Sequence, residues 1–213
     1  MIKTGVLSVN SLIVPLNFEN SNLGKKKCFA VDPAACSLSK DENKILTYLK
    51  ENKFECAGII LTHSHFDHIL GIQILKSAFP NAKIFIHKDE EKELGFACGD
   101  MNKSVLTFFG ETQIMSEVAK QPPADVLLKD NDEIFGWKVI HTPGHSPGSI
   151  CLFNSNEKIL ISGDTLFDHN GCGRTDMYGG NEKFLTESLE RLEHEIPKGT
   201  LVYPGHESFG FKF

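Results

Sequence analysis

Short apolar runs separated by Gly, Asn and Pro dominate the first third of the chain, a pattern that predicts β-strands. We place these strands, with a turn over Asn20–Lys26 before the third, at Ile2–Val9, Leu12–Phe18, Cys28–Val31 and Ala57–Leu61. Before the fourth strand, Ser39 and Glu42 have the spacing of a capping box, and an apolar stripe follows them. This pattern predicts a helix that begins at Ser39 and ends at Asn52.

The rest of the chain alternates between strand and helix patterns, apart from one polar segment. A helical stripe over Ile69–Phe79 ends at Pro80, whereas Lys88–Pro123 has weak periodicity and predicts short helices and a loop. An amphipathic pattern predicts a last helix over Asn181–His194. Strand patterns occur at Lys83–His87, Val126–Leu128, Ile134–Ile140, Ser149–Phe153, Lys158–Ser162 and Leu201–Tyr203. This order predicts an α/β chain in which two sheets pack face to face with helices outside.

Composition narrows the class of protein further. The 213 residues suit one domain, which we place over residues 1–213, and 22 basic against 28 acidic side chains give a net charge of −6. This charge disfavours nucleic acids and anionic membranes, and no apolar run reaches the ~18 residues that span a bilayer. The sequence after Met1 shows no signal-peptide pattern. The six Cys are scattered without a CxxC pair, which favours reduced thiols, so we expect a cytoplasmic protein.

Nine His are present, and three of them share a short segment directly after the strand predicted at Ala57–Leu61. This segment reads THSHFDH and holds four metal donors, which are His63, His65, Asp67 and His68. Imidazole nitrogen and carboxylate oxygen suit Zn, Fe and Mn. Because one ion cannot accept all four donors at reasonable angles, the segment predicts two adjacent metal positions.

Three further donors lie in loops that follow predicted strands. They are His145 in TPGHSPG, Asp164 in SGDT and His206 in YPGH. Rigid strands that end in ligand-bearing loops hold a site accurately. We therefore expect these donors to meet the first four at one edge of the sandwich.

The HxHxDH run, TPGHSPGS, GDTLF and PGH together resemble the motifs of the metallo-β-lactamase superfamily, over nearly the whole chain. The resemblance implies an αβ/βα four-layer sandwich of two mixed β-sheets, with helices on the outer faces and the metal site at one edge. It implies two divalent ions, which we expect to be Zn with Fe or Mn as alternatives, and it makes Asp67 and Asp164 the expected catalytic residues. The implied ligands are His63, His65 and His145 for one ion, Asp67, His68 and His206 for the other, and Asp164 as the bridge.

The stretch GDTLFDHNGCGRTD is most similar to glyoxalase II-type thioesterases, which hydrolyse acylated glutathione. This similarity implies hydrolysis of S-(2-hydroxyacyl)glutathione or a related thioester or ester, with a hydroxide that bridges the two ions as nucleophile. Asp164 is not the Cys typical of the lactam-degrading branch, which favours a thioester over a β-lactam. The alternative is a persulfide dioxygenase of the same superfamily, with one iron at His63, His145 and Asp164. A metal-stabilised binding module and a nuclease are further alternatives, and the net charge disfavours the nuclease.

Substrate contacts are less sharply indicated than metal ligands. Arg174 has the position of a basic residue that binds the glycine carboxylate of glutathione in glyoxalase II-like proteins, and pairing with Asp176 is the alternative. Tyr178 lies near the same loop and is a second candidate. Asp32 either orients a ligand His or shapes a turn.

The chain after the last predicted ligand is short, because only seven residues follow His206. We therefore expect the helical region with which glyoxalase II proteins bind glutathione to be missing, and Glu90–Pro123 is a candidate replacement lid. The sequence leaves the oligomeric state open.

Overall fold

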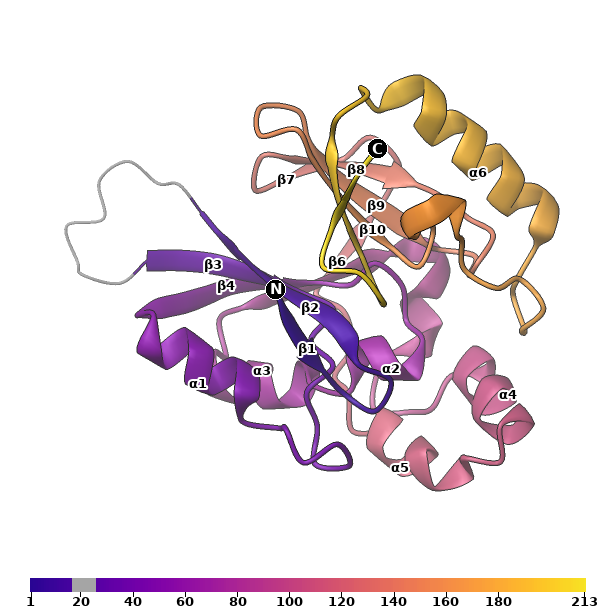
Figure 1. Ribbon diagram of the computed structural model, residues 1–213. Coiled ribbons are helices and arrows are strands. Elements are labelled where there is room, and N and C mark those ends of the chain that lie inside the picture. Colours follow the sequence, from indigo (N-terminus) through magenta and orange to yellow (C-terminus); the bar gives the residue numbers. More distant parts are fainter. Residues whose placement is uncertain (17–25) are drawn as a thin grey trace.

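Two six-stranded mixed sheets face each other in the computed structural model, which describes residues 1–16 and 26–213 (Figure 1). In the first sheet, strands β1 to β6 lie side by side in chain order, at Ile2–Thr4, Val9–Pro15, Lys26–Val31, Phe54–Ile60, Lys83–His87 and Val126–Leu128. In the second sheet, strands β7 to β12 also lie in chain order, at Glu133–Ile134, Trp137–His141, Ile150–Asn154, Ile159–Gly163, Leu201–Pro204 and Phe211–Lys212. Neighbours from β3 to β6 are parallel, as are β10 and β11, and the other neighbours are antiparallel.

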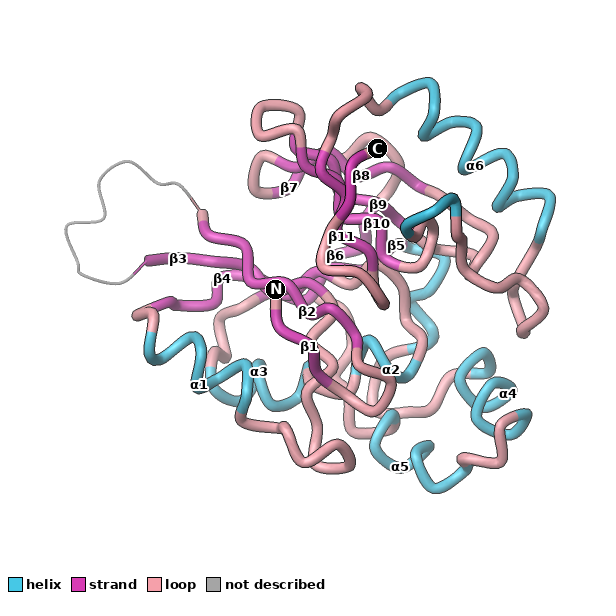
Figure 2. Tube along the Cα trace, viewed as in Figure 1, coloured by secondary structure: helices cyan, strands magenta, loops and turns pink. Residues whose placement is uncertain are grey.

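Helices form the two outer layers. Helices α1 (Lys44–Glu51) and α3 (Ile72–Ala78) cover the first sheet, and α6 (Glu182–Glu195) covers the second (Figure 1). Short α2 (Phe66–Ile69) follows β4, and the 3-10 turn η3 (Asp168–Asn170) precedes α6. Between β5 and β6 the chain forms four short helices, namely η1 (Lys88–Glu93), α4 (Asp100–Phe108), η2 (Thr112–Ile114) and α5 (Met115–Val118). Of these, α4 and α5 lie to one side of the sandwich (Figure 2). The four-layer αβ/βα sandwich is confirmed.

Three groups of buried apolar side chains correspond to the three interfaces between these layers. Because successive side chains of a strand point to opposite faces, Cys28 and Ala30 of β3 pack toward the outer helices, whereas Phe29 and Val31 pack toward the second sheet. Strand β9 alternates in the same way between the inter-sheet core and α6. These strands are buried on both faces and give the loops at their ends a rigid base.

Two predicted strands are interrupted by tight turns. The run Ile2–Val9 is divided into β1 and the start of β2, because Gly5 and Ser8 have positive φ angles of 78° and 58°. The run Ile134–Ile140 forms the hairpin of β7 and β8 around Gly136, whose φ is 80°. In both runs the residues of the turn sit among apolar neighbours, which hides the turn from the pattern.

One strand is additional to the predicted ones, and one predicted region is not tested. No sequence pattern predicts the two-residue strand β12, which pairs with the edge strand β11. The predicted strand end at Phe18 and the turn over Asn20–Lys26 lie outside the described residues, apart from Lys26, which begins β3.

The capping box predicted at the start of α1 is wrong. The Ser39 hydroxyl donates to the Cys36 carbonyl at 3.1 Å and also bonds the carboxylate of Asp41, so it stabilises the preceding loop. Helix α1 begins only at Lys44.

The helix predicted over Ile69–Phe79 is divided into α2 and α3 at Gly71. The Gly71 N–H donates to the Pro33 carbonyl at 2.7 Å, and a Cβ at Gly71 would lie only 2.6 Å from that oxygen. This close approach requires glycine and packs the α2–α3 junction against the loop after β3. Within the described residues, no helix combines the length and apolar character that crossing a membrane requires.

Candidate metal centre

The loop that follows β4 is held at its start by an aspartate from the end of the neighbouring strand. Asp32 is 2% exposed; its Oδ1 accepts the Thr62 N–H at 2.8 Å and its Oδ2 accepts the Thr62 hydroxyl at 2.6 Å. Strands β3 and β4 are parallel, so their carboxyl ends lie at the same edge of the sheet. Asp32 thereby fixes the point from which the HxHxDH segment extends.

His63, His65 and His145 form the first triad, and their ligand nitrogens lie within 4.8 Å of one another. His65 Nδ1 lies 2.8 Å from His145 Nε2. His63 Nε2 is buried and has no hydrogen-bond partner among the described residues. Three imidazole nitrogens that gather in this way are a donor set for a divalent ion.

Asp67, His68 and His206 form the second triad. His206 Nε2 lies 3.1 Å from His68 Nε2 and 3.2 Å from Asp67 Oδ2, and the last two atoms are 3.6 Å apart. Asp67 and His68 belong to α2, whereas His206 follows β11. The second triad therefore joins the two halves of the sandwich.

Asp164 lies between the two triads, after β10. Its Oδ1 is 3.5 Å from His68 Nε2, and its Oδ2 is 3.5 Å from His206 Nε2 and 3.7 Å from His145 Nε2. A Cβ at Gly205 would lie 2.1 Å from Asp164 Oδ1, which explains the glycine of the PGH motif. The structure thus brings all seven sequence-predicted metal donors together.

Four of the five His have their outward nitrogen hydrogen-bonded. The pairs are His63 Nδ1 with Thr62 Oγ1 (3.0 Å), His68 Nδ1 with Asp32 Oδ2 (3.0 Å), His145 Nδ1 with Arg174 O (2.8 Å) and His206 Nδ1 with Leu7 O (3.2 Å). Because each Nδ1 donates to its partner, Nε2 is the nitrogen that faces the centre and is available to an ion. The hydrogen bond to Asp32 shows that this residue both shapes the turn and orients a His.

Protonation states follow from burial and from neighbouring charges. Burial, together with His68, lowers the pKa of His63 well below its usual value, and burial lowers the pKa of His65 to about 3. Burial alone would raise the pKa of Asp164, but His68 and the other imidazoles hold it well below the ordinary value. Burial alone would lower the pKa of His68, but Asp164 and Asp67 raise it well above the usual value. His63 and His65 are therefore neutral beside ionised carboxylates, whereas His68 holds a proton that an ion at its Nε2 would have to displace. This donor set fits divalent ions.

The two candidate substrate-binding residues lie outside this cluster of ligands. Arg174 is 45% exposed, and its Nε and Nη2 each donate to the Asp176 carboxylate at 2.7 Å. Its guanidinium carbon also lies 5.5 Å from the centre of the Phe109 ring. Tyr178 is exposed and lines a separate cleft of about 390 Å³ with residues of η1 and α4.

Two buried polar residues near the centre are indicated by no sequence motif. Glu90 of η1 and Asn102 of α4 hydrogen-bond the loops that carry the first triad. Both belong to Lys88–Pro123, where the polar sequence is typical of a solvated surface. The apolar pattern of the sequence does not show that Glu90 is buried, because η1 has acidic residues at four of its six positions.

A second cluster of possible donors contains His87, Asp89 and His141. The two imidazole rings are stacked, with centroids 3.9 Å apart and planes inclined by 16°. The lone pair of an imidazole nitrogen lies in the ring plane, and one ion cannot lie in two nearly parallel planes this far apart. These rings therefore pack against each other and do not converge on a metal.

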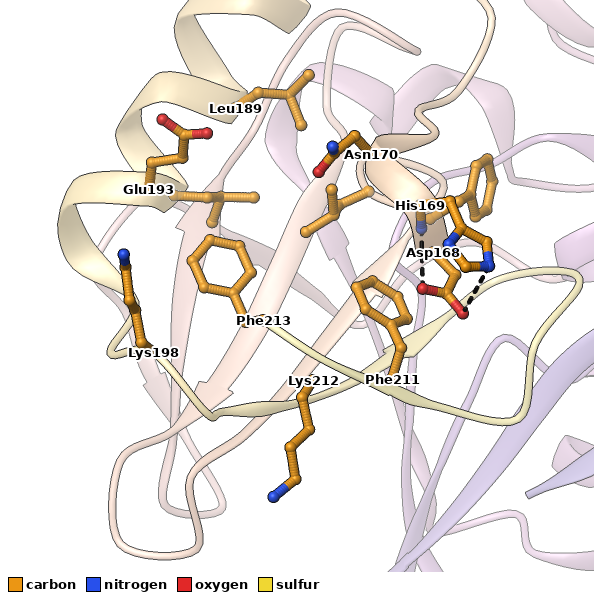
Figure 3. Close-up of a pocket in the computed structure, with 12 residues that line it drawn as sticks. Asp168, His169, Asn170, Leu189, Glu193, Lys198, Phe211, Lys212 and Phe213 are labelled. Carbon is orange, nitrogen blue, oxygen red and sulfur yellow. Dashed lines mark hydrogen bonds and ion pairs between the residues drawn. The ribbon is translucent and has the colours of Figure 1, made fainter.

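A larger cleft of about 780 Å³ lies between η3, α6 and the last strand (Figure 3). Phe211 and Phe213 line it together with Leu189, and the charged side chains of Lys198 and Glu193 border it. Phe167 also lines this cleft, and its ring centroid lies 6.4 Å from that of His206. One wall of the cleft therefore adjoins the second triad.

The sequence as a whole matches one family model, described as "Metallo-beta-lactamase superfamily", over residues 19–206. A protein of Bacillus subtilis named "Probable metallo-hydrolase YqgX" is 34% identical, and the match covers 84% of this chain and 80% of the relative. A hydroxyacylglutathione hydrolase of Bdellovibrio bacteriovorus is 31% identical over 85% of this chain, but only 59% of that relative is covered. The match thus spans about three fifths of the glutathione-thioester hydrolase.

Solved structures agree with the sequence match. The BLEG-1 B3 metallo-beta-lactamase superposes with a TM-score of 0.79 and 29% identity, over 99% of this chain and 92% of that one. A di-iron-bound form of TTHA1623 superposes with a TM-score of 0.78 and 26% identity, over 99% and 93% of the two chains. The fold and the metal-binding character of the site are therefore shared with known proteins.

Proposed function

Because the chain belongs to the metallo-beta-lactamase superfamily and is a metal-dependent hydrolase of that superfamily, we propose that it is a binuclear thioesterase. One observation carries the binuclear assignment: two triads of donors face each other with the Asp164 carboxylate between them. A single ion cannot be bound by all seven donors, and a carboxylate placed between two triads is suited to contact two ions.

Each donor has a defined role in this proposal. His63, His65 and His145 would hold one ion, Asp67, His68 and His206 would hold the other, and Asp164 lies where it could serve both. Two such ions supply the Lewis acidity that activates water and polarises a carbonyl near neutral pH. The hydrogen bonds at Nδ1 orient the imidazole rings in the folded protein, so the rings need not reorient when the reaction occurs. Asp67 and Asp164 offset the charge of the ions and offer oxygen atoms that accept a proton from water.

The proposed substrate is S-(2-hydroxyacyl)glutathione or a related thioester. The similarity to a hydroxyacylglutathione hydrolase supports this class. A thiol with a pKa near 8.5 leaves as a thiolate without a strong general acid, so the donors of this centre are sufficient. Arg174 is the proposed contact for a substrate carboxylate, which would have to compete with Asp176 for the guanidinium. Tyr178 is proposed as a weaker contact, from the cleft beside η1.

The test of this proposal is hydrolysis of S-lactoylglutathione and of thioesters that lack glutathione, with elemental analysis of the same sample. Thioester turnover by a chain that holds two ions, most simply Zn, supports the proposal. A metal-replete protein that cleaves no thioester contradicts the proposed substrate and leaves the family assignment intact. Elemental analysis also distinguishes Zn, Fe and Mn. The di-iron-bound form of TTHA1623 is a precedent for iron.

Hydrolysis of β-lactams is a second candidate function, because the BLEG-1 structure resembles this chain over nearly its whole length. A chromogenic cephalosporin in the same panel tests it directly. Turnover of the β-lactam above that of every thioester would replace the first proposal.

The persulfide dioxygenase named above is the remaining enzymatic alternative. It predicts one iron per chain and O₂ uptake that depends on a persulfide, with no hydrolysis of thioesters. We further propose a single domain over residues 1–213, a small-molecule substrate and a cytoplasmic location. The six Cys are free, and five of them are buried, as expected in a reducing compartment.

A further inference from the structure

The segment between β5 and β6 reaches the metal centre through two buried polar side chains, Glu90 and Asn102, which are 1% and 0% exposed. We propose that they are positioning residues that hold the backbone of both loops of the first triad, so that metal affinity depends on them. This inference rests on the metal centre of the proposed function and is independent of the substrate. The segment between β5 and β6 would thus hold the loops of the first triad in position.

Glu90 links the two loops that carry the first triad. Its Oε2 accepts the N–H of Ser64, the residue between the first two ligands. Its Oε1 accepts the hydroxyl of Ser146, which follows the third ligand, and the N–H of Gly148 at 2.9 Å. One carboxylate therefore connects the loop after β4 in the first sheet to the loop after β8 in the second.

Asn102 forms a second hydrogen bond to the loop after β4. Its Nδ2 donates to the Ser64 carbonyl at 2.7 Å, so both backbone polar groups of Ser64 are bonded to the segment. A buried donor or acceptor that is left unpaired destabilises the fold, and a charged group does so most. The loop therefore cannot rotate the imidazoles of His63 and His65 away from the centre without losing these hydrogen bonds.

Asp125 and Gln121 show what a purely structural polar residue of the same segment looks like. The Asp125 carboxylate accepts the N–H of Ile84 in β5 at 2.9 Å and pairs with Lys76 of α3 at 3.1 Å. Gln121 is buried and bonds the backbone of Gln73 and Leu70 in the α2–α3 region. Neither side chain has a hydrogen bond to the loops of the first triad among the described residues, so each provides a matched control.

The test compares Glu90→Gln with Asp125→Asn and Asn102→Ala with Gln121→Ala. In Glu90→Gln an amide NH₂ replaces one acceptor oxygen and faces an N–H or O–H donor, so the link to one loop is lost. Each protein is prepared metal-free, checked for folding by circular dichroism and thermal unfolding, and titrated with Zn²⁺ against a chromophoric chelator. The absorption spectrum of the Co²⁺-loaded protein reports the geometry of the ligands independently of activity.

We expect Glu90→Gln and Asn102→Ala to bind Zn²⁺ about 10–100-fold more weakly at one site and to alter the Co²⁺ spectrum. We expect the two controls to keep wild-type affinity and spectrum, even where their Tm is lower. Wild-type affinity and spectrum in folded Glu90→Gln and Asn102→Ala would overturn the proposal, and so would equal weakening in the controls. If Glu90→Gln does not fold, Asn102→Ala alone decides between these outcomes. A wild-type chain that binds no ion would instead contradict the metal centre itself.

Discussion

Asp32 connects the fold to the metal centre through a single buried carboxylate. Its two oxygens accept the backbone N–H and the hydroxyl of Thr62, and Oδ2 also lies 3.0 Å from His68 Nδ1. Thr62 in turn bonds Nδ1 of His63. One side chain thus orients a ligand of each triad, which an exposed turn residue cannot do.

Replacement of Asp32 by Asn should therefore weaken metal binding. An amide offers one acceptor oxygen, so its NH₂ group must face a donor, either Thr62 or the His68 ring. We expect about a 10–100-fold loss of affinity, seen as fewer ions per chain by elemental analysis after dialysis. Asp41→Asn is the control, because the Asp41 carboxylate accepts N–H groups of Gly5 and Cys36 in a loop away from the ligands. Equal ion content in both variants would contradict the expectation.

At the scale of residues, metal ligands and the side chains that support them differ in how well the sequence predicts them. The seven candidate ligands are predictable because metal coordination restricts the residue type, and the HxHxDH spacing places four of them in one loop. Glu90 and Asn102 are not, because each acts on the backbone of Ser64, 26 and 38 residues earlier in the chain. The parallel pairing of β4 with β5 brings the ends of these two strands, and so the segments that follow them, close together.

At the scale of elements, the junction of α2 and α3 depends on the close approach of Gly71 to the chain after β3. A Cβ at this position would lie 2.6 Å from the Pro33 carbonyl and 2.9 Å from the Ala35 carbonyl, and neither backbone atom can move as a flexible side chain can. Gly71→Ala should therefore lower the free energy of unfolding by about 1–3 kcal/mol. Urea denaturation measures this value. A change below about 0.5 kcal/mol, which is ordinary for surface substitutions, would contradict the close approach.

Helix α6 is attached to the second sheet by Arg191. Its guanidinium donates to Asp130 at 2.9 Å, to the His141 carbonyl at 3.2 Å and to Glu195 at 2.6 Å. Partial burial would raise the pKa of Asp130, but the hydrogen bond from Arg191 outweighs it and lowers the pKa below the ordinary value. A carboxyl group whose pKa is lowered by folding stabilises the fold above its unfolded pKa, near 3.9. That stabilisation is lost as the pH falls through the lowered folded value.

Asp130→Asn should consequently reduce stability at pH 7 and have little effect in acid. Because the pair is about one-third exposed, solvent screening limits the loss at pH 7 to about 1 kcal/mol or less. Urea unfolding of the metal-free wild type and variant at pH 7 and near pH 3 measures the difference. A difference that stays constant with pH would show that Asp130 acts through its shape and not through its charge.

The elements themselves show where sequence patterns succeed and fail. Strands such as Lys83–His87 are predicted at their observed bounds because continuous apolar runs have few alternatives. The apolar pattern does not predict the helix break at Gly71 or the turn at Gly136, because each follows from a backbone conformation or contact that leaves the pattern intact. Both positions are glycine, which does not interrupt an apolar run.

At the scale of the whole molecule, the metal centre joins the two sheets. His63, His65, Asp67 and His68 extend from the first sheet, whereas His145, Asp164 and His206 follow strands of the second. An unfolded chain has no such arrangement, so ions held by these donors would bind the folded state and stabilise it. For each ion the gain is about 2.7 kcal/mol when the free metal concentration is one hundred times Kd.

Removal of the ions by a chelator should therefore lower the Tm of the wild-type protein. In a domain of this size each kcal/mol corresponds to about 2–4 °C, so we expect a loss of about 5–10 °C for each ion removed. Thermal unfolding with and without chelator, with elemental analysis of both samples, measures the effect. The double variant His145→Ala, His206→Ala lacks one ligand of each triad, and its Tm should barely respond to the chelator. If the wild type loses its ions and keeps its Tm, ion binding does not stabilise the packing of the two sheets.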